Sequence, residues 1–119
     1  RDPTRGGVSS SLNEIAAQSG VSIQVRESAI AIRDEVRGAC EMLGLDPLYV
    51  ANEGKLLAVV PPEHADAIVE IMRRHPLGTG AGIIGTVSEG RPGLVTMKTA
   101  FGTTRIIDML AGDQLPRIC

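Results

Sequence analysis

The chain has 119 residues, a formal net charge of −2 and two aromatic residues, Tyr49 and Phe101. This length suits one domain with a single core, which must be built from aliphatic side chains. The weakly acidic charge argues against a nucleic-acid-binding protein, which usually carries a basic stripe, and no apolar run is long enough to span a membrane. Two cysteines are too few for a disulfide framework or a four-ligand zinc site, so we expect a reducing, cytoplasmic location.

The first third of the chain predicts two helices with a strand between them. Residues 8–18 place apolar side chains on one helical stripe, and Gly20 follows as a C-cap. Residues 21–27 alternate apolar and polar side chains, as a half-buried strand does. Residues 32–44 predict a second helix, with an inward stripe of Val36, Ala39, Cys40 and Leu43.

The middle of the chain predicts a hairpin followed by a helix. Residues 46–52 begin with a turn signal and become a short strand, and residues 55–61 form a continuous apolar run that is typical of a buried strand. The "NEG" at 52–54 would be the tight turn between these strands. Residues 62–75 predict a third helix that starts at a proline, with an inward stripe of Ala65, Ile68, Val69 and Met72.

The rest of the chain predicts three strands, over residues 82–89, 93–100 and 103–110, although the last segment could instead begin a helix at Asp108. Strands that alternate with helices and end in a meander indicate a mixed sheet with packed helices. The expected fold class is therefore an α/β (α+β) layered sandwich.

The stretch "DPTRGG" at 2–7 is the first candidate site. Two glycines before a helix allow consecutive backbone N–H groups to point at an anion, and the helix dipole favours that anion. Arg5 could add a bidentate phosphate contact. The simpler interpretation is a turn in which Thr4 or Asp2 caps the helix. The stretch matches neither a Walker A loop nor G-x-G-x-x-G.

Glu53, within "NEGK" at 52–55, is the second candidate. A carboxylate at a strand end beside a pocket can act as a general base, and the alternative is a solvated turn residue. His64 and His75 lie at opposite ends of one predicted helix, too far apart to share a metal ion, so we interpret both as surface residues. Cys40 is interpreted as a core residue.

The chain ends in "DQLPRIC", with Cys119 as its last residue. The adjacent terminal carboxylate disfavours the thiolate, so Cys119 is a poor resting nucleophile and suits an attachment point better than a catalytic one. A tail over residues 113–119 reaches roughly 20 Å when extended, far enough to carry a small group between sites. From this residue alone, an incidental terminal cysteine stays an alternative.

Together, "DPTRGG", "LNEIA", "NEGK", "FGTTRIID" and the closing "PRIC" resemble the hydrogenase expression/formation protein E family. These are the carbamoyl dehydratases of nickel–iron hydrogenase maturation, in the superfamily of aminoimidazole ribonucleotide synthetase and selenophosphate synthetase. The resemblance covers essentially the whole chain, and "PRIC" is its most specific part. It implies that residues 1–112 are the C-terminal domain of a two-domain enzyme, with the fold of the synthetase's C-terminal domain, and that 113–119 are a flexible tail.

The resemblance also implies a reaction. A carbamoyltransferase places a carbamoyl group on the sulfur of the terminal cysteine, here Cys119, and ATP drives dehydration of this thiocarboxamide to a thiocyanate. The cyano group passes to iron on a scaffold complex and becomes a cyanide ligand of the hydrogenase. Most contacts to ATP and magnesium, and the homodimer interface, are expected in an N-terminal domain outside this chain. We therefore expect this chain alone to be inactive and to hold no metal site.

The same resemblance implies roles for individual residues. Glu53 is implied as the base or proton relay, and Pro116 and Arg117 are implied to dock the tail. The residues implied to contact the nucleotide phosphates are Thr4, Arg5, Gly6 and Gly7. Two alternatives stay open: a docking module that presents the tail to the carbamoyltransferase and the scaffold, or part of an ATP-dependent synthetase of a small metabolite.

Overall fold

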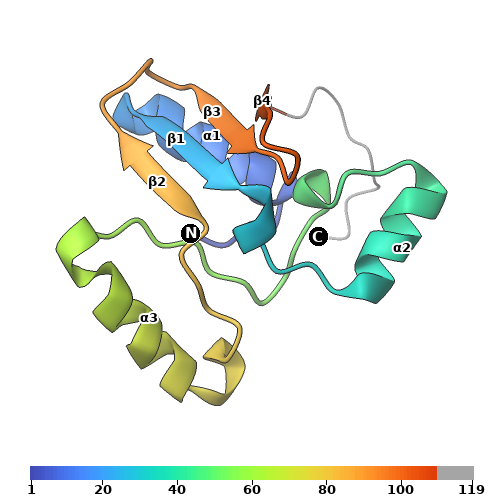
Figure 1. The fold of residues 1–119 in the computed structure, drawn as a ribbon, viewed down its shortest axis with the longest axis horizontal. Helices are drawn as coiled ribbons and strands as arrows, with labels where there is room; N and C mark the ends of the chain where they lie inside the picture. Colours follow the sequence, from blue (N-terminus) through green and yellow to red (C-terminus); the bar gives the residue numbers. More distant parts are fainter. Residues whose placement is uncertain (110–119) are drawn as a thin grey trace.

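The computed structural model describes residues 1–109; the predictions for Pro116, Arg117 and Cys119 fall outside the described residues. Residues 1–109 form a four-stranded mixed sheet with three α-helices (Figure 1). The elements are α1 (Gly7–Ser19), β1 (Ser22–Arg26), α2 (Asp34–Leu43), α3 (Ala65–Arg74), β2 (Gly85–Ser88), β3 (Val95–Lys98) and β4 (Thr104–Ile106). The predicted layered fold with a mixed sheet is confirmed.

The sheet has the strand order β2-β1-β3-β4. β1 pairs antiparallel with β2 and parallel with β3, and β4 pairs antiparallel with β3. Ile23 faces Val95 across the parallel pair and Val25 faces Met97, and all four side chains are buried. The strand predicted from alternation over residues 21–27 is thus confirmed, because every second residue of β1 enters the core.

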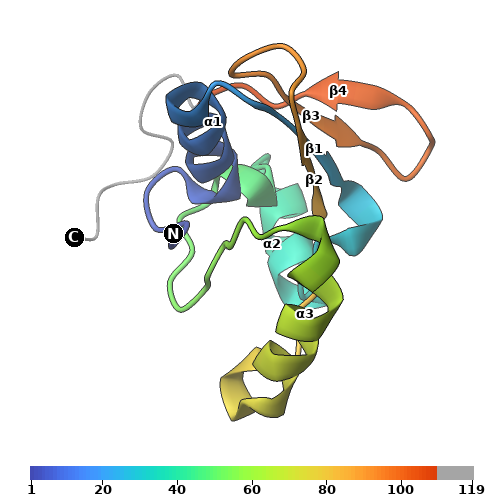
Figure 2. The ribbon, with the colours of Figure 1, turned by 90° about the vertical axis from the view of Figure 1, so that its left-hand side faces the viewer.

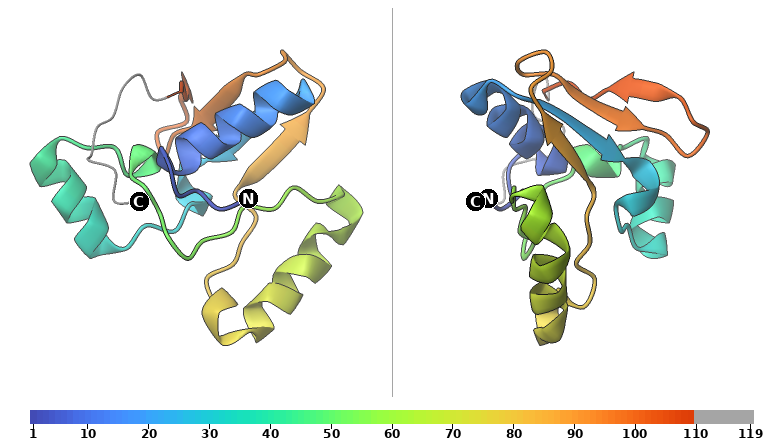
Figure 3. Two further views of the ribbon diagram at one scale, coloured as in Figure 1. Left: turned by 180° about the vertical axis from the view of Figure 1, so that it is seen from behind. Right: turned by 60° about the vertical axis from the view of Figure 1, so that its left-hand side comes forward.

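The hydrophobic core lies between this sheet and α1, which runs along one face of it (Figures 2 and 3). Leu12 and Ala16 are the buried residues that α1 contributes, and Val8 and Ile15 pack beside them. Gly20 ends the helix in a left-handed conformation, with φ of 65°, and its N–H donates to the Ala16 carbonyl. The predicted apolar stripe and C-cap of this helix are both confirmed.

The hairpin predicted over residues 46–61 is wrong. Pro47–Tyr49 form a 3₁₀ helix, η2, which Asp46 caps by accepting a hydrogen bond from the Leu48 N–H at 3.0 Å. Residues 55–60 belong to no strand, and Leu56 and Val59 are 63% and 58% exposed. An apolar run indicates burial only if something covers it, and the described residues leave this run largely uncovered.

The helices α2 and α3 stand away from the sheet (Figure 1). Cys40 is buried as predicted, but Val36 and Leu43 are 43% and 71% exposed, so most of the predicted inward stripe of α2 is wrong within residues 1–109. α3 packs against the short 3₁₀ turns at its two ends and has no fully buried residue. No helix in the described part of the chain has the length and apolar content that crossing a membrane requires.

The polar face of α1 holds the end of the described chain. Asn13 is buried, and its Nδ2 donates to the Ile107 and Ser9 carbonyls, both at 2.9 Å. The Ser9 hydroxyl donates to the Asp108 carbonyl at 2.9 Å. The strand predicted over 103–110 therefore ends at Ile106, because the next residues turn onto α1.

Replacing Asn13 with Ala should destabilise the protein by about 1–3 kcal/mol, because the buried Ile107 carbonyl loses its side-chain donor. Gln18→Ala on the exposed part of the same helix is the control and should stay within about 0.5 kcal/mol of the wild type. Urea unfolding of each variant measures the difference. Equal stabilities would show that Asn13 does not anchor this segment.

Candidate functional site

The "TRGG" loop, residues 4–7, forms a tight turn at the start of α1. Gly6 and Gly7 both have left-handed backbones, with φ of 67° and 65°, and Gly6 is the N-cap of the helix. No side chain caps this end, so the prediction that Thr4 or Asp2 caps the helix is wrong. The backbone N–H groups that begin α1 are consequently left without a side-chain partner, which is the condition for binding an anion at a helix start.

Gly7 also allows a close contact between two segments of backbone. A Cβ at Gly7 would lie 2.5 Å from the Leu48 carbonyl oxygen and 2.6 Å from that of Val50, and real Cβ atoms essentially never approach other atoms this closely. Only a glycine combines this φ with this proximity. The missing side chain therefore lets the start of α1 lie directly against η2.

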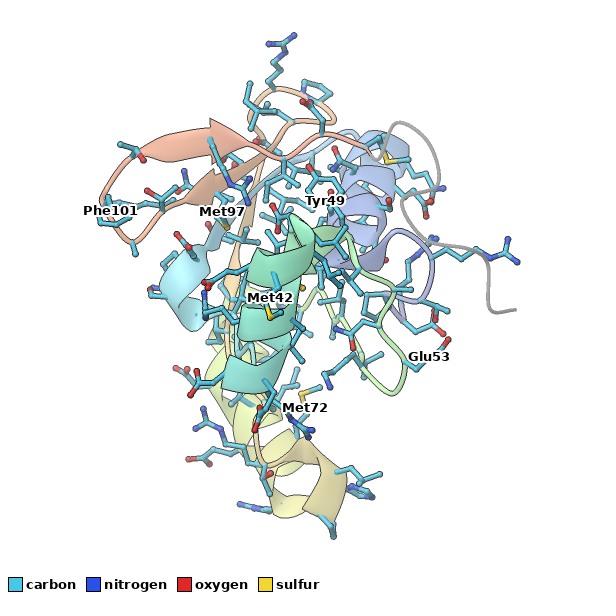
Figure 4. All side chains as sticks on the ribbon, turned by 90° about the vertical axis from the view of Figure 1, so that its right-hand side faces the viewer. Met42, Tyr49, Glu53, Met72, Met97 and Phe101 are labelled. Atoms are coloured by element: carbon cyan, nitrogen blue, oxygen red, sulfur yellow. The ribbon has the colours of Figure 1, made fainter. Side chains whose placement is uncertain are left out.

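This contact brings Glu53 next to the "TRGG" loop. The chain that leaves η2 runs back along the N-terminal residues, where the Asn52 N–H donates to the Pro3 carbonyl at 3.1 Å. Five residues further on, Leu57 and Arg1 exchange two backbone hydrogen bonds, at 2.7 and 2.9 Å. Glu53 lies on the loop between these two attachments (Figure 4), so two candidates that are far apart in sequence share one edge of the molecule.

The chain that leads to the tail lies against the first turns of α1. Ser9, which binds the Asp108 carbonyl, lies only two residues after Gly7. Phe101, in contrast, lies at the far end of the β3–β4 hairpin, away from Glu53 (Figure 4). The start of α1 is thus joined to the Glu53 loop through residues 1–7, and to the start of the tail segment through Ser9.

The charged groups of this edge are open to a ligand. Arg5 and Glu53 are both exposed, and neither forms an ion pair with another residue in 1–109. Arg1 is bound to Glu14 in an ion pair, which leaves Arg5 as the cation of the loop. The edge thus offers a guanidinium and backbone N–H groups for an anion and, beside them, a carboxylate that can accept a proton.

No three His, Cys, Asp or Glu side chains within the described range gather closely enough to hold a metal ion. The surface positions predicted for His64 and His75 are confirmed, and the His75 Nδ1 accepts a hydrogen bond from the Leu77 N–H at 3.2 Å.

Sequence reasoning missed Ser9 and Asn13, the residues that attach the tail-proximal segment to α1. Their only signal was a polar run, "SSS" and then Asn13, inside a stretch with helical periodicity. Buried polar side chains on a helix almost always bind a specific partner. The partners themselves could not be predicted from the sequence, because Asp108 lies 99 residues after Ser9 and Ile107 lies 94 residues after Asn13.

Residues 1–98 match the model of the family described as "AIR synthase related protein, C-terminal domain". The chain belongs to this family. The fold, with its mixed sheet and helices, agrees with that assignment. The family accounts for most of the described chain, including the "TRGG" loop and Glu53.

The chain is also similar over its whole length to named members of the superfamily. It is 59% identical to "Carbamoyl dehydratase HypE" of Azotobacter vinelandii, covering all of this chain and 35% of that protein. A solved HypE in complex with ATP superposes with a TM-score of 0.93 at 49% identity, over 100% of this chain and 37% of the other. A HypE chain in a HypE–HypF complex has a TM-score of 0.87 at 45% identity, over 92% and 35%. The resemblance read from the sequence is confirmed, and this chain spans about a third of the length of the curated relatives it matches.

Replacing Gly7 with Ala should destabilise the protein by about 1–3 kcal/mol or more, because strain at positive φ adds to a collision with two carbonyl oxygens. Gly20→Ala is the matched control, since Gly20 has the same φ of 65° but no neighbour within 4 Å of the new Cβ. Urea unfolding of the two variants separates the collision from the strain. If both lose the same stability, the contact with η2 contributes nothing.

Proposed function

We propose that the full-length protein is an ATP-dependent carbamoyl dehydratase that acts on its own Cys119, in the maturation of nickel–iron hydrogenases. The observation that carries the proposal is that the start of α1, which holds the "TRGG" loop, contacts both the chain that leads to Glu53 and the segment that leads to the tail. The names of the relatives and the solved HypE–ATP complex support it. Residues 1–112 would be the C-terminal half of the catalytic unit, and residues 113–119 the tail that carries the substrate.

The proposed chemistry removes water from a thiocarboxamide on the Cys119 sulfur. The amide oxygen attacks the γ-phosphorus of ATP, the terminal P–O bond breaks, and ADP leaves. The carbonyl oxygen then departs as phosphate while the nitrogen gives up its two protons, which leaves a thiocyanate on the sulfur. Such a reaction needs stabilisation of charge on the phosphates and a base near the nitrogen.

The residues at the described edge suit these two needs. Arg5 would bind phosphate oxygens through its guanidinium, and Thr4 and the backbone N–H groups of Gly6 and Gly7 would complete the contact. Glu53 would accept the nitrogen protons, because its carboxylate is exposed and unpaired among residues 1–109. Magnesium would be bound mostly by the part of the protein outside this chain, as the family resemblance implies.

Two protein partners follow from the proposed chemistry. A carbamoyltransferase must load Cys119, and an iron-holding scaffold must accept the cyano group. A solved complex of HypE with HypF supports binding to the first of these partners, the carbamoyltransferase. Pro116 and Arg117 would hold the tail at each docking site, and the full-length protein would act in the cytoplasm as a homodimer.

Replacing Cys119 with Ala in the full-length protein should abolish thiocyanate formation, because the carrier atom is lost. The measurement is mass spectrometry of the C-terminal peptide after incubation with carbamoyltransferase, carbamoyl phosphate and ATP. Wild type should gain a carbamoyl mass and then lose water. Intact synthesis of a small metabolite by the Cys119→Ala variant would favour a synthetase instead. The chain alone should gain the carbamoyl mass without losing water, and dehydration by it would show that it is catalytically complete.

Replacing Glu53 with Gln should leave carbamoylation of Cys119 intact and slow its dehydration by about 100-fold or more, because the proton acceptor is removed. Glu63→Gln, another exposed carboxylate, is the control and should dehydrate at the wild-type rate. The two steps are followed separately by the mass of the C-terminal peptide over time. Dehydration by Glu53→Gln at the wild-type rate would reduce Glu53 to a loop residue.

A further inference from the structure

An open apolar groove runs along α2 and has no role in the proposed reaction. It has a volume of about 360 Å³, within the size range of small ligand sites, and is lined almost entirely by apolar atoms. The residues that line it are Glu35, Val36, Ala39, Cys40, Leu43, Leu45 and Val50. Glu35 is its one charged residue, so the groove suits an apolar segment with a cation at its edge.

The groove collects the apolar side chains that α2 fails to bury against the rest of the described chain. Leu43 is 71% exposed and Val36 is 43% exposed, whereas Cys40 at the helix centre is 6% exposed. Met42 is also exposed, but it does not line the groove. An apolar stripe of this kind, open along a helix, is characteristic of a surface that receives another segment.

The groove begins close to the place where the tail starts. Val50 lines it, and the Val50 carbonyl oxygen is one of the two that lie against Gly7. Two residues further along α1, Ser9 holds the Asp108 carbonyl. The ten residues from 110 to 119 reach roughly 33 Å when extended, so the end of the tail can cover the groove.

The sequence of the tail complements this groove. Leu115 and Ile118 are three residues apart, and the proline between them favours a polyproline conformation, in which residues three apart share a side. Arg117, next to this apolar side, has the charge opposite to that of Glu35. The tail therefore combines an apolar pair with a cation, as the groove requires.

We propose that the α2 groove is a resting dock for the tail, in which Leu115 and Ile118 enter the groove, Arg117 pairs with Glu35, and Cys119 lies near Cys40. This dock is separate from the edge formed by Glu53 and the "TRGG" loop. It shields the thiol of Cys119 from solvent while no group is attached. The proposal does not depend on ATP or on carbamoyl chemistry, so its test and that of the proposed reaction can fail independently.

The test is the rate at which iodoacetamide alkylates Cys119 in the full-length protein, resolved by peptide mass spectrometry. Leu43→Glu places a charge inside the groove and should speed alkylation of Cys119 by about tenfold. Met42→Glu, the same change on the neighbouring exposed residue, should leave the rate at the wild-type value. Equal rates in wild type and Leu43→Glu would overturn the proposal, including the case in which another part of the protein fills the groove.

A charge swap gives a second, independent measurement. Glu35→Arg should also speed alkylation of Cys119, and adding Arg117→Glu should restore the slow rate by recreating the pair in reverse.

Diamide, which takes two electrons and two protons from a pair of thiols, should join Cys40 to Cys119 in wild type and much less in Leu43→Glu. Failure of the swap to restore protection, or equal cross-linking in both proteins, would contradict the dock.

Discussion

The contact between Gly7 and the carbonyl oxygens of Leu48 and Val50 is the constraint on which the candidate site depends. It brings the start of α1 against η2, so the chain after η2 has to run beside the N-terminal residues. Asp46 stabilises the other side of η2, because it caps this short helix and pairs with Arg105 of β4 at 2.8 Å. The "TRGG" turn and the Glu53 loop are thus tied to both the helix and the sheet.

In the proposed reaction, this edge would form only one wall of the catalytic centre. Arg5 and Glu53 are exposed in the described chain, where water weakens every interaction between charges. Their effect on a reacting group would grow once the tail and the rest of the protein exclude water, because fixed charges act more strongly at low dielectric. An open half-site therefore agrees with a reaction that starts only after the loaded tail has docked.

The spacing of apolar residues along the chain correctly predicted those helices and strands that bury one face in the core. The periodicity of α1 and the alternation in β1 gave those elements correctly, because both bury one face against the core. The apolar run at 55–60 and the stripe of α2 misled, since their cover is not among residues 1–109. At the candidate site, the two glycines and Glu53 were predicted from their chemistry and from the family resemblance. That these residues lie close together could not be predicted, because their proximity depends on hydrogen bonds such as that from Asn52 to Pro3, which link segments far apart in the sequence.

A carrier tail imposes a limit on how tightly any one site can hold it. When one site holds the tail, the apparent affinity of the tail for every other site falls in proportion to the fraction of tails that remain free. A deep pocket along α2 would trap Cys119, whereas an open groove, lined by side chains such as Leu43 at 71% exposure, can release it. In the proposed reaction, a carbamoyl group would change the end of the tail and not the groove, so the same surface would favour the free thiol at rest and lose the tail to the Glu53 edge once the tail is loaded. The uncovered stripe of α2 is then consistent with the tail's need to leave.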